Sequence, residues 1–142
     1  MSYHLSKTSM ANMEGCHPDL IKLAQHTIVR TRHDFGIRET SVRTVQQQVE
    51  FLEQGWSTTM NSRHIPENNA CGLSCAIDFF AYDKDGNITS SAEYYKRISQ
   101  DFVTCAIQLG IPIELGALFG TFFDGGHVQL AWIYEPAARR RR

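Results

Sequence analysis

The sequence lacks a long hydrophobic run, a strong excess of charge of either sign and an export signal. No apolar stretch among the 142 residues approaches the ~20 residues of a membrane-spanning helix, so a transmembrane segment is not expected. The formal net charge of −1 creates no field that would attract nucleic acid, so no nucleic-acid partner is expected. Residues 1–7 lack the charged-then-apolar pattern of a signal peptide, which predicts a protein made in a cytoplasm and not exported by the standard route.

Cysteines are few, which disfavours a disulfide scaffold. The four are Cys16, Cys71, Cys75 and Cys105. The Cys71-x3-Cys75 pair has no second pair beside it and is poor evidence for a zinc knuckle. A disulfide between the two would need an oxidising compartment, and free thiols are expected in a cytoplasmic product. Cys105 lies on the apolar face of a predicted helix and is expected in the core. No thiol-peptidase signature surrounds any of them.

Hydrophobic residues make up 42% of the chain and charged residues 20%, which is typical of one globular domain. We place that domain at residues 1–138 and treat residues 139–142 as a basic tail that is expected to be disordered. The predicted helices cover 17–31, 44–54 and 91–109. The predicted strands cover 35–37, 76–82, 111–115 and 127–134. Strands and helices do not alternate regularly, so the sequence predicts an α+β fold with a long loop over 57–75.

Candidate metal ligands occur in three places along the chain. His64 ends the triplet Ser62-Arg63-His64, Asp78 lies inside a predicted strand, and His127 opens the last strand directly after Asp124-Gly125-Gly126. Two histidines, one carboxylate and a second carboxylate nearby suit a hydrolytic zinc site with a position open to water. Each of these residues alone is more often structural, and only their joint occurrence favours an enzyme.

Strand alternation places Asp78 on the face opposite Ile77 and Phe79, and His127 on the face opposite Val128 and Leu130. Both can therefore line one cleft, which His64 would close. The Gly125-Gly126 pair would let the backbone bend so that Asp124 reaches the metal and transfers protons. Arg43 precedes a predicted helix. Its forked, permanently charged guanidinium suits a developing oxyanion.

Three blocks carry a resemblance to a known family. They are Val42-Arg43-Thr44-Val45-Gln46-Gln47, Ser62-Arg63-His64, and Ala76-Ile77-Asp78 together with Asp124-Gly125-Gly126-His127-Val128-Gln129-Leu130. With them the chain resembles the zinc D,D-carboxypeptidase and L-alanyl-D-glutamate endopeptidase family, which includes phage endolysins. The match runs roughly from Leu20 to Trp132.

The resemblance implies a small antiparallel sheet flanked by helices. It implies zinc bound by His64, Asp78 and His127, Asp124 as the catalytic acid and base, and Arg43 on the reacting carbonyl. The implied substrate is the peptidoglycan stem peptide, cut at the L-alanyl-D-glutamate bond by a monomeric endolysin that a holin releases from the host cytoplasm to the periplasm. The alternatives are a D-alanyl-D-alanine carboxypeptidase or dipeptidase on the same scaffold, and a non-catalytic module that zinc stabilises and that binds the cell wall.

Three further features need an interpretation. The thirteen residues between His64 and Asp78 are more than is usual in the family, and we interpret residues 65–75 as an insertion. Asp83-x-Asp85-x-Asn87 imitates a calcium loop, but its glycine and its twelfth residue are wrong for one, so a hairpin turn is expected. The run Arg139–Arg142 is expected to be a solvated tail, and it could contact anionic lipid or lipopolysaccharide.

Overall fold

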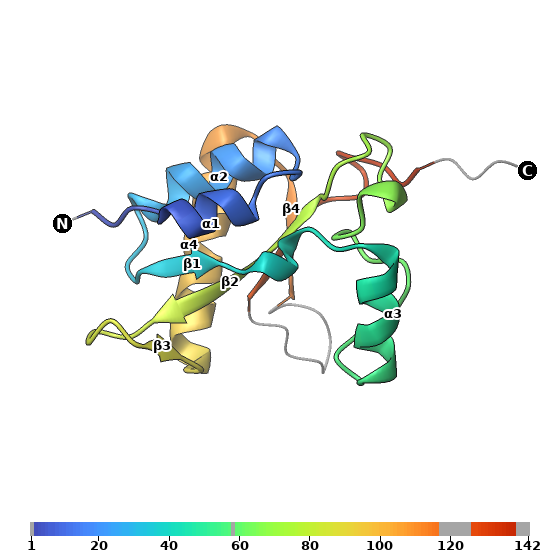
Figure 1. Cartoon of the computed structure of the whole chain (residues 1–142). Coiled ribbons are helices and arrows are strands. Elements are labelled where there is room, and N and C mark those ends of the chain that lie inside the picture. Colours follow the sequence, from blue (N-terminus) through green and yellow to red (C-terminus); the bar gives the residue numbers. More distant parts are fainter. Residues whose placement is uncertain (1, 58, 117–125, 139–142) are drawn as a thin grey trace, which may run out of the picture.

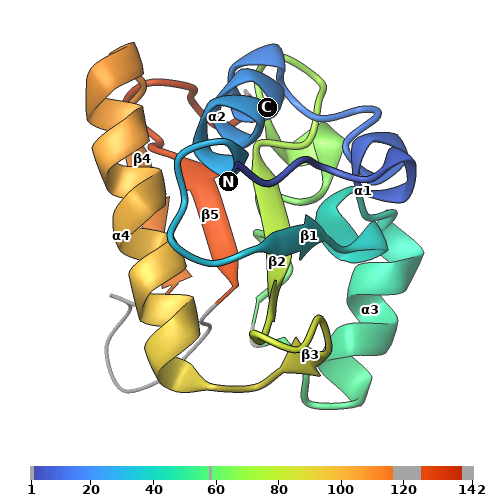
Figure 2. The same ribbon diagram turned by 90° about the vertical axis from the view of Figure 1, so that its left-hand side faces the viewer.

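A five-stranded antiparallel sheet forms the centre of the computed structural model, which describes residues 2–57, 59–116 and 126–138 (Figure 1). The strand order is β1-β2-β5-β4, and β3 pairs with β2 outside this path. The strands are β1 (Phe35–Ile37), β2 (Ala76–Tyr82), β3 (Ile88–Thr89), β4 (Ile113–Leu115) and β5 (His127–Leu130). The last strand in sequence therefore lies between two strands that precede it, as Figure 2 shows for β5 and β2.

The helices begin and end where local sequence signals place them. They are α1 (Lys7–Asn12), α2 (Pro18–Ile28), α3 (Val45–Glu53) and α4 (Ala92–Leu109), with short 3-10 helices at η1 (Glu39–Ser41) and η2 (Pro66–Asn68). Thr44 and Gln47 form the predicted capping box of α3, which satisfies two backbone N–H groups at its start. Gly110 ends α4 in the left-handed conformation that glycine adopts without a steric penalty.

The hydrophobic core lies between one face of the sheet and the helices α2 and α4. Each element contributes the residues that its periodicity predicts. From α2 come Leu20, Leu23, Ala24 and Ile28; from α4 come Tyr95, Ile98, Phe102, Cys105 and Ala106; from the sheet come Phe35, Ile37, Ile77, Phe79, Ala81, Val128 and Leu130. Because side chains alternate along a strand, Asp78 and His127 face away from this core.

The α+β prediction and most predicted elements are confirmed, and several boundaries are corrected. Helix α2 ends at Ile28 instead of residue 31, and β4 starts at residue 113 instead of 111. The last strand ends at Leu130 instead of 134, because a turn closed by the Tyr134 N–H and the Ala131 carbonyl follows, and Ile133 is 94% exposed. The prediction omitted the short elements α1 and β3.

Two interpretations of side features can be examined directly. The segment 83–87 is a hairpin turn, in which the Asp83 carboxylate accepts from the N–H groups of Asp85 and Asn87. All four cysteines are free thiols.

No helix of the described part is long and apolar enough to cross a bilayer. The run 139–142, interpreted above as a tail, lies outside the described residues.

Candidate metal centre

Asp78 and His127 are direct partners across the central ladder of the sheet. Strands β2 and β5 are antiparallel, and the register pairs Asp78 with His127, Ile77 with Val128 and Ala76 with Gln129. Paired residues of an antiparallel ladder project on the same face, about 4.5–5.5 Å apart at Cβ. The sheet therefore positions two of the three predicted ligands rigidly and toward the same space.

His64 completes the group from the loop before η2. Its carbonyl accepts from the Arg43 N–H at 3.0 Å, and its own N–H donates to the Ser62 hydroxyl at 3.2 Å. The His64 Nε2 atom lies 3.1 Å from Asp78 Oδ1 and 3.1 Å from His127 Nδ1, and these last two atoms are 3.6 Å apart. The structure thus brings together all three ligands predicted from the sequence, in a buried group that could hold a metal ion.

The partners behind each imidazole fix which nitrogen carries a hydrogen. His64 Nδ1 lies 3.0 Å from the Ser41 carbonyl, which only accepts, so Nδ1 must donate and Nε2 keeps its lone pair. His127 Nε2 lies 2.7 Å from Gln129 Oε1, and the Gln129 amide is oriented because its Nε2 donates to Glu114 Oε2 at 3.1 Å. His127 Nδ1 therefore also keeps its lone pair.

Three electron-pair donors consequently face one another across 3.1–3.6 Å. Ligand atoms of a tetrahedral zinc site with bonds of about 2.0–2.1 Å lie roughly 3.3 Å apart, so the spacing fits such an ion. Burial lowers the pKa of His64, which keeps its ring neutral. Burial alone would raise the pKa of Asp78, yet this pKa lies well below the ordinary value, and the Arg43 guanidinium 2.7 Å from Oδ2 favours the ionised carboxylate. Neutral imidazoles and an ionised carboxylate are the states that bind a metal.

The second oxygen of Asp78 is held by groups outside the ligand set. Asp78 Oδ2 accepts from the Thr40 hydroxyl at 2.7 Å and from Arg43 Nη2 at 2.7 Å, while the Asp78 N–H donates to Ser41 Oγ at 2.9 Å. These contacts leave Oδ1 facing the two histidines. Hydrogen bonds of this kind orient a ligating carboxylate and tune its affinity for the metal.

Arg43, predicted to bind the reacting carbonyl, lies directly beside the ligands. Its Nε donates to the Thr40 carbonyl at 2.9 Å, its Nη1 donates to Gln48 Oε1 at 3.0 Å, and its guanidinium stacks on the Phe51 ring. Together with the bond to Asp78, these contacts use one hydrogen on each nitrogen. A second hydrogen on Nη1 and on Nη2 is left for a substrate oxygen.

The predicted proton-transfer residue Asp124 lies outside the described residues, as does Gly125. Gly126 is described, and its role is steric. A Cβ atom at this position would lie 2.2 Å from the Phe79 carbonyl oxygen, and the Phe79 N–H donates to the Gly126 carbonyl at 2.8 Å. The chain just before His127 therefore needs glycine to approach β2 closely.

Sequence reasoning missed the residues that support the ligands: Thr40, Ser41, Gln48, Glu114 and Gln129. Gln129 had one signal, because it shares a strand face with His127. Thr40, Ser41 and Glu114 contact partners far away in the sequence, Gln48 contacts nearby Arg43, and nothing in the local pattern distinguishes these four from ordinary polar residues.

Comparison with known proteins identifies a family and structural relatives. The model of the phage L-alanyl-D-glutamate peptidase family matches residues 1–131. The chain is also similar to the crystal structure of the Serratia marcescens L-Ala D-Glu endopeptidase ChiX, at 27% identity and a TM-score of 0.80, over 93% of this chain and 92% of that one. No curated protein matches the sequence significantly.

Proposed function

The chain belongs to the phage L-alanyl-D-glutamate peptidase family, and from that premise we propose that His64, Asp78 and His127 hold a catalytic zinc ion in this hydrolase of peptidoglycan stem peptides. The supporting observation is the convergence of three lone-pair atoms within 3.6 Å. Two imidazoles and one carboxylate are a ligand set of catalytic zinc sites, which keep a fourth position open.

Zinc at such a site lowers the pKa of a water molecule and polarises the scissile carbonyl. The residues of the chain supply the rest. We assign Asp124 to accept the proton of the attacking water and to deliver it to the leaving amine, as the new C–O bond forms and the peptide C–N bond breaks. Arg43 donates its remaining N–H groups to the carbonyl oxygen as negative charge develops there.

The test of this function is digestion of purified Gram-negative peptidoglycan, followed by mass spectrometry of the released peptides. We expect new N-terminal D-glutamate, loss of release after treatment with a chelator, and recovery on adding Zn²⁺ but not Mg²⁺ or Ca²⁺. Release of free D-alanine instead would identify a D,D-carboxypeptidase. Turnover that a chelator leaves unchanged would refute the metal mechanism.

Replacing Asp124 by asparagine tests its role. The change keeps the size of the side chain but removes the proton acceptor, so we expect kcat to fall about 10²–10⁴-fold while zinc still binds in the same amount. Activity on peptidoglycan and the metal content of the purified protein are the two measurements. Asp85→Asn in the hairpin turn is the matched control and should leave both unchanged. Full activity in Asp124→Asn would remove Asp124 from the mechanism.

We also propose that the chain acts as a monomer in the periplasm after a holin releases it, and that Arg139–Arg142 contact anionic lipid there. Each arginine near such a surface would add about 1 kcal/mol of binding energy. Deletion of residues 139–142 should weaken sedimentation with vesicles that contain anionic lipid, and should not change hydrolysis of soluble stem peptide. Equal binding of the shortened chain would contradict the lipid contact.

A further inference from the structure

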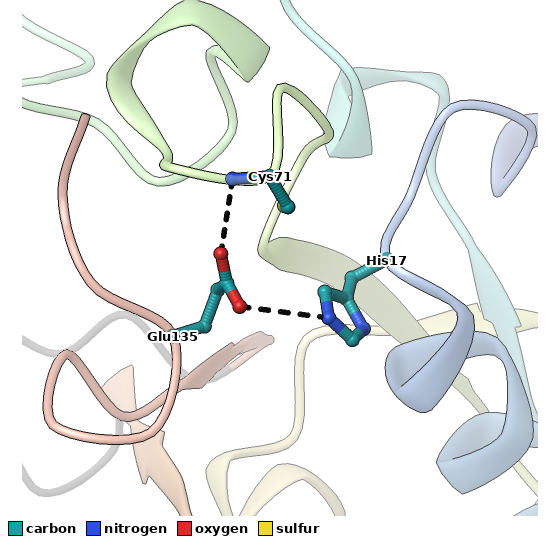
Figure 3. Close-up of side chains that lie close together, drawn as sticks. All are labelled: His17, Cys71 and Glu135. Carbon is teal, nitrogen blue, oxygen red and sulfur yellow. Dashed lines mark hydrogen bonds and ion pairs between the residues drawn. The ribbon is translucent and has the colours of Figure 1, made fainter.

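A second group of ligand-type side chains gathers where three segments of the described chain meet. His17 caps the start of α2, Cys71 lies in the loop between η2 and β2, and Glu135 follows β5. One ligand atom of each lies within 4.8 Å of those of the other two. In Figure 3 the Glu135 carboxylate lies between the main-chain nitrogen of Cys71 and the His17 ring, with an interaction to each. Nothing in the peptidase mechanism uses this group.

A fourth ligand-type atom lies beside Cys71 but outside the set of ligand atoms that are mutually within 4.8 Å, so a side chain must turn for it to join the site. The Sγ of the buried Cys75 lies 3.6 Å from the Sγ of the exposed Cys71. In a tetrahedral zinc site with Zn–S bonds of about 2.3 Å, two sulfur atoms lie roughly 3.8 Å apart. The observed separation is close to that value, and the two thiols already face each other.

Main-chain contacts hold the three segments in place. The His17 N–H donates to the Ser74 carbonyl at 2.8 Å, so the start of α2 is bonded to the residue directly before Cys75. The Ala70 N–H donates to the Pro136 carbonyl at 2.9 Å, which joins the loop to the segment after β5, and the Cys71 N–H donates to Glu135 Oε1 at 3.0 Å. Hydrogen bonds therefore hold the three segments together at this junction, and the ligand atoms are close for that reason.

From this junction we infer that His17, Cys71, Cys75 and Glu135 form a structural zinc site, separate from the catalytic centre. Two thiolates, an imidazole and a carboxylate would fill all four tetrahedral positions, and a closed set is the mark of a structural zinc site. Thiolate ligands favour zinc over calcium or magnesium. The site would fasten the inserted loop 65–75 to both the first long helix and the chain after the last strand.

The charges of such a site balance. Two thiolates and one carboxylate carry three negative charges, and Zn²⁺ carries two positive ones. The buried Arg63 supplies another positive charge, because its guanidinium interacts electrostatically with Cys75, Glu135 and Cys71. The group of ion, ligands and Arg63 is thus neutral, which is what a partly buried site requires.

His17 must change its tautomer to bind zinc through Nε2. Its Nδ1 now accepts from the Asp19 N–H at 3.0 Å, and its Nε2 lies 3.7 Å from Glu135 Oε2. With zinc on Nε2, the hydrogen moves to Nδ1, which then no longer accepts from the Asp19 N–H. The Asp19 Oδ2 atom, which accepts from the Tyr134 hydroxyl at 2.6 Å, lies 3.9 Å away and must approach to accept this hydrogen. A carboxylate behind the ligating histidine is the usual support in zinc sites.

Metal content tests the inference on the full chain. The protein is purified with a phosphine reductant, dialysed against Zn²⁺, and assayed for zinc per chain by mass spectrometry. We expect about two ions per chain in the natural protein and about one in the Cys71→Ser/Cys75→Ser variant. Loading with Co²⁺ should produce a thiolate-to-cobalt charge-transfer band, which the catalytic ligands cannot produce because they include no sulfur.

Matched variants separate this site from the catalytic one and from damage to the fold. Cys105→Ala removes a core thiol and should keep both ions and the cobalt band. Glu135→Gln keeps an acceptor for the Cys71 N–H, so it should retain the fold by circular dichroism, keep the cobalt band and bind the second ion more weakly. One ion per chain with no thiolate band in the natural protein would overturn the inference, and so would loss of both free thiols to a disulfide under these reducing conditions. Either outcome leaves the catalytic site untouched.

Discussion

At the residue scale, the electronic state of the metal centre is set by the acceptors behind the two histidines. The Ser41 carbonyl and the Gln129 amide oxygen each take the hydrogen of one ring, which turns both lone pairs toward Asp78. Three such donors repel one another in a buried space unless a cation lies between them. The arrangement therefore suits a bound metal ion, which would accept all three lone pairs.

Gln129→Met is a sharp test of this support. Methionine keeps the length and volume of the side chain but removes the acceptor for His127 Nε2 and the donor to Glu114, so the ring can adopt the wrong tautomer. We expect the affinity for zinc to fall about 10–100-fold, measured by competition with a chromogenic chelator.

Gln108→Met is the matched control for that experiment. Gln108 pairs with His26 at 3.0 Å on the surface, away from the metal centre, and its replacement should leave the zinc affinity unchanged. Equal affinity in Gln129→Met and the natural protein would show that the Gln129 amide does not orient His127.

At the element scale, the pairing of β2 with β5 fixes the relative positions of Asp78 and His127. Asp78 and His127 are paired residues, so a shift of one residue in register would move one ligand to the opposite face of the sheet. Gly126 lies at the end of this ladder, in contact with the backbone of Phe79. A Cβ atom added there would meet backbone atoms, which cannot rotate away as a flexible side chain could.

Gly126→Ala should disturb both stability and metal binding. The new Cβ would meet the Phe79 carbonyl oxygen, so the strands must separate at the residue next to His127. We expect the free energy of unfolding to fall by about 1–3 kcal/mol in urea and the zinc affinity to fall with it.

Gly86→Ala, in the turn before β3, distinguishes the two effects. Gly86 has a φ of 80° and open space around it, so alanine there costs backbone strain of about 1 kcal/mol and cannot reach the metal centre. Unchanged zinc affinity is expected in Gly86→Ala. The same unchanged affinity in Gly126→Ala would contradict the close-approach argument.

The features that could be predicted from the sequence are those determined by residues close together in the chain. The bounds of β2 and the cap of α3 followed from a few adjacent residues, and the three ligands followed from short blocks that resemble a family. The end of β5 did not, because the Val128–Tyr134 pattern continues beyond Leu130 although the chain turns at Ala131. Two further features depend on tertiary folding and have no signal in the local sequence. They are the supporting contacts between β4 and β5 and the proximity of His17 to Cys71.

At the scale of the whole molecule, Arg63 joins the inserted loop to the end of the sheet. This fully buried guanidinium donates to Asn69 Oδ1 and to the carbonyls of Leu130 and Glu135, and it lies 3.7 Å from the centre of the Trp132 ring. It is next to His64 in sequence, so the same segment carries a metal ligand and the main anchor of the loop.

Arg63→Lys should destabilise the fold although it keeps the charge. The planar guanidinium of arginine reaches three acceptors that lie in different directions, and the single ammonium of lysine cannot. Buried acceptors would then lose their hydrogen-bond partner. We expect a loss of about 1.5–3 kcal/mol in the free energy of unfolding, measured with urea. Arg30→Lys is the control, because the exposed Arg30 guanidinium donates to the His26 carbonyl at the surface and its change should cost little. Equal stability of the two variants would contradict the anchoring role.

The position of β5 in the sheet also bears on the timing of synthesis. On the ribosome, β2 emerges long before β5, yet β5 must insert between β2 and β4, and it brings His127 with it. Until that strand has left the exit tunnel, a nascent chain has neither a completed central sheet nor a third metal ligand. Chains that end before β5 therefore lack the complete candidate site, so that site can form only in a chain whose translation has reached the last strand.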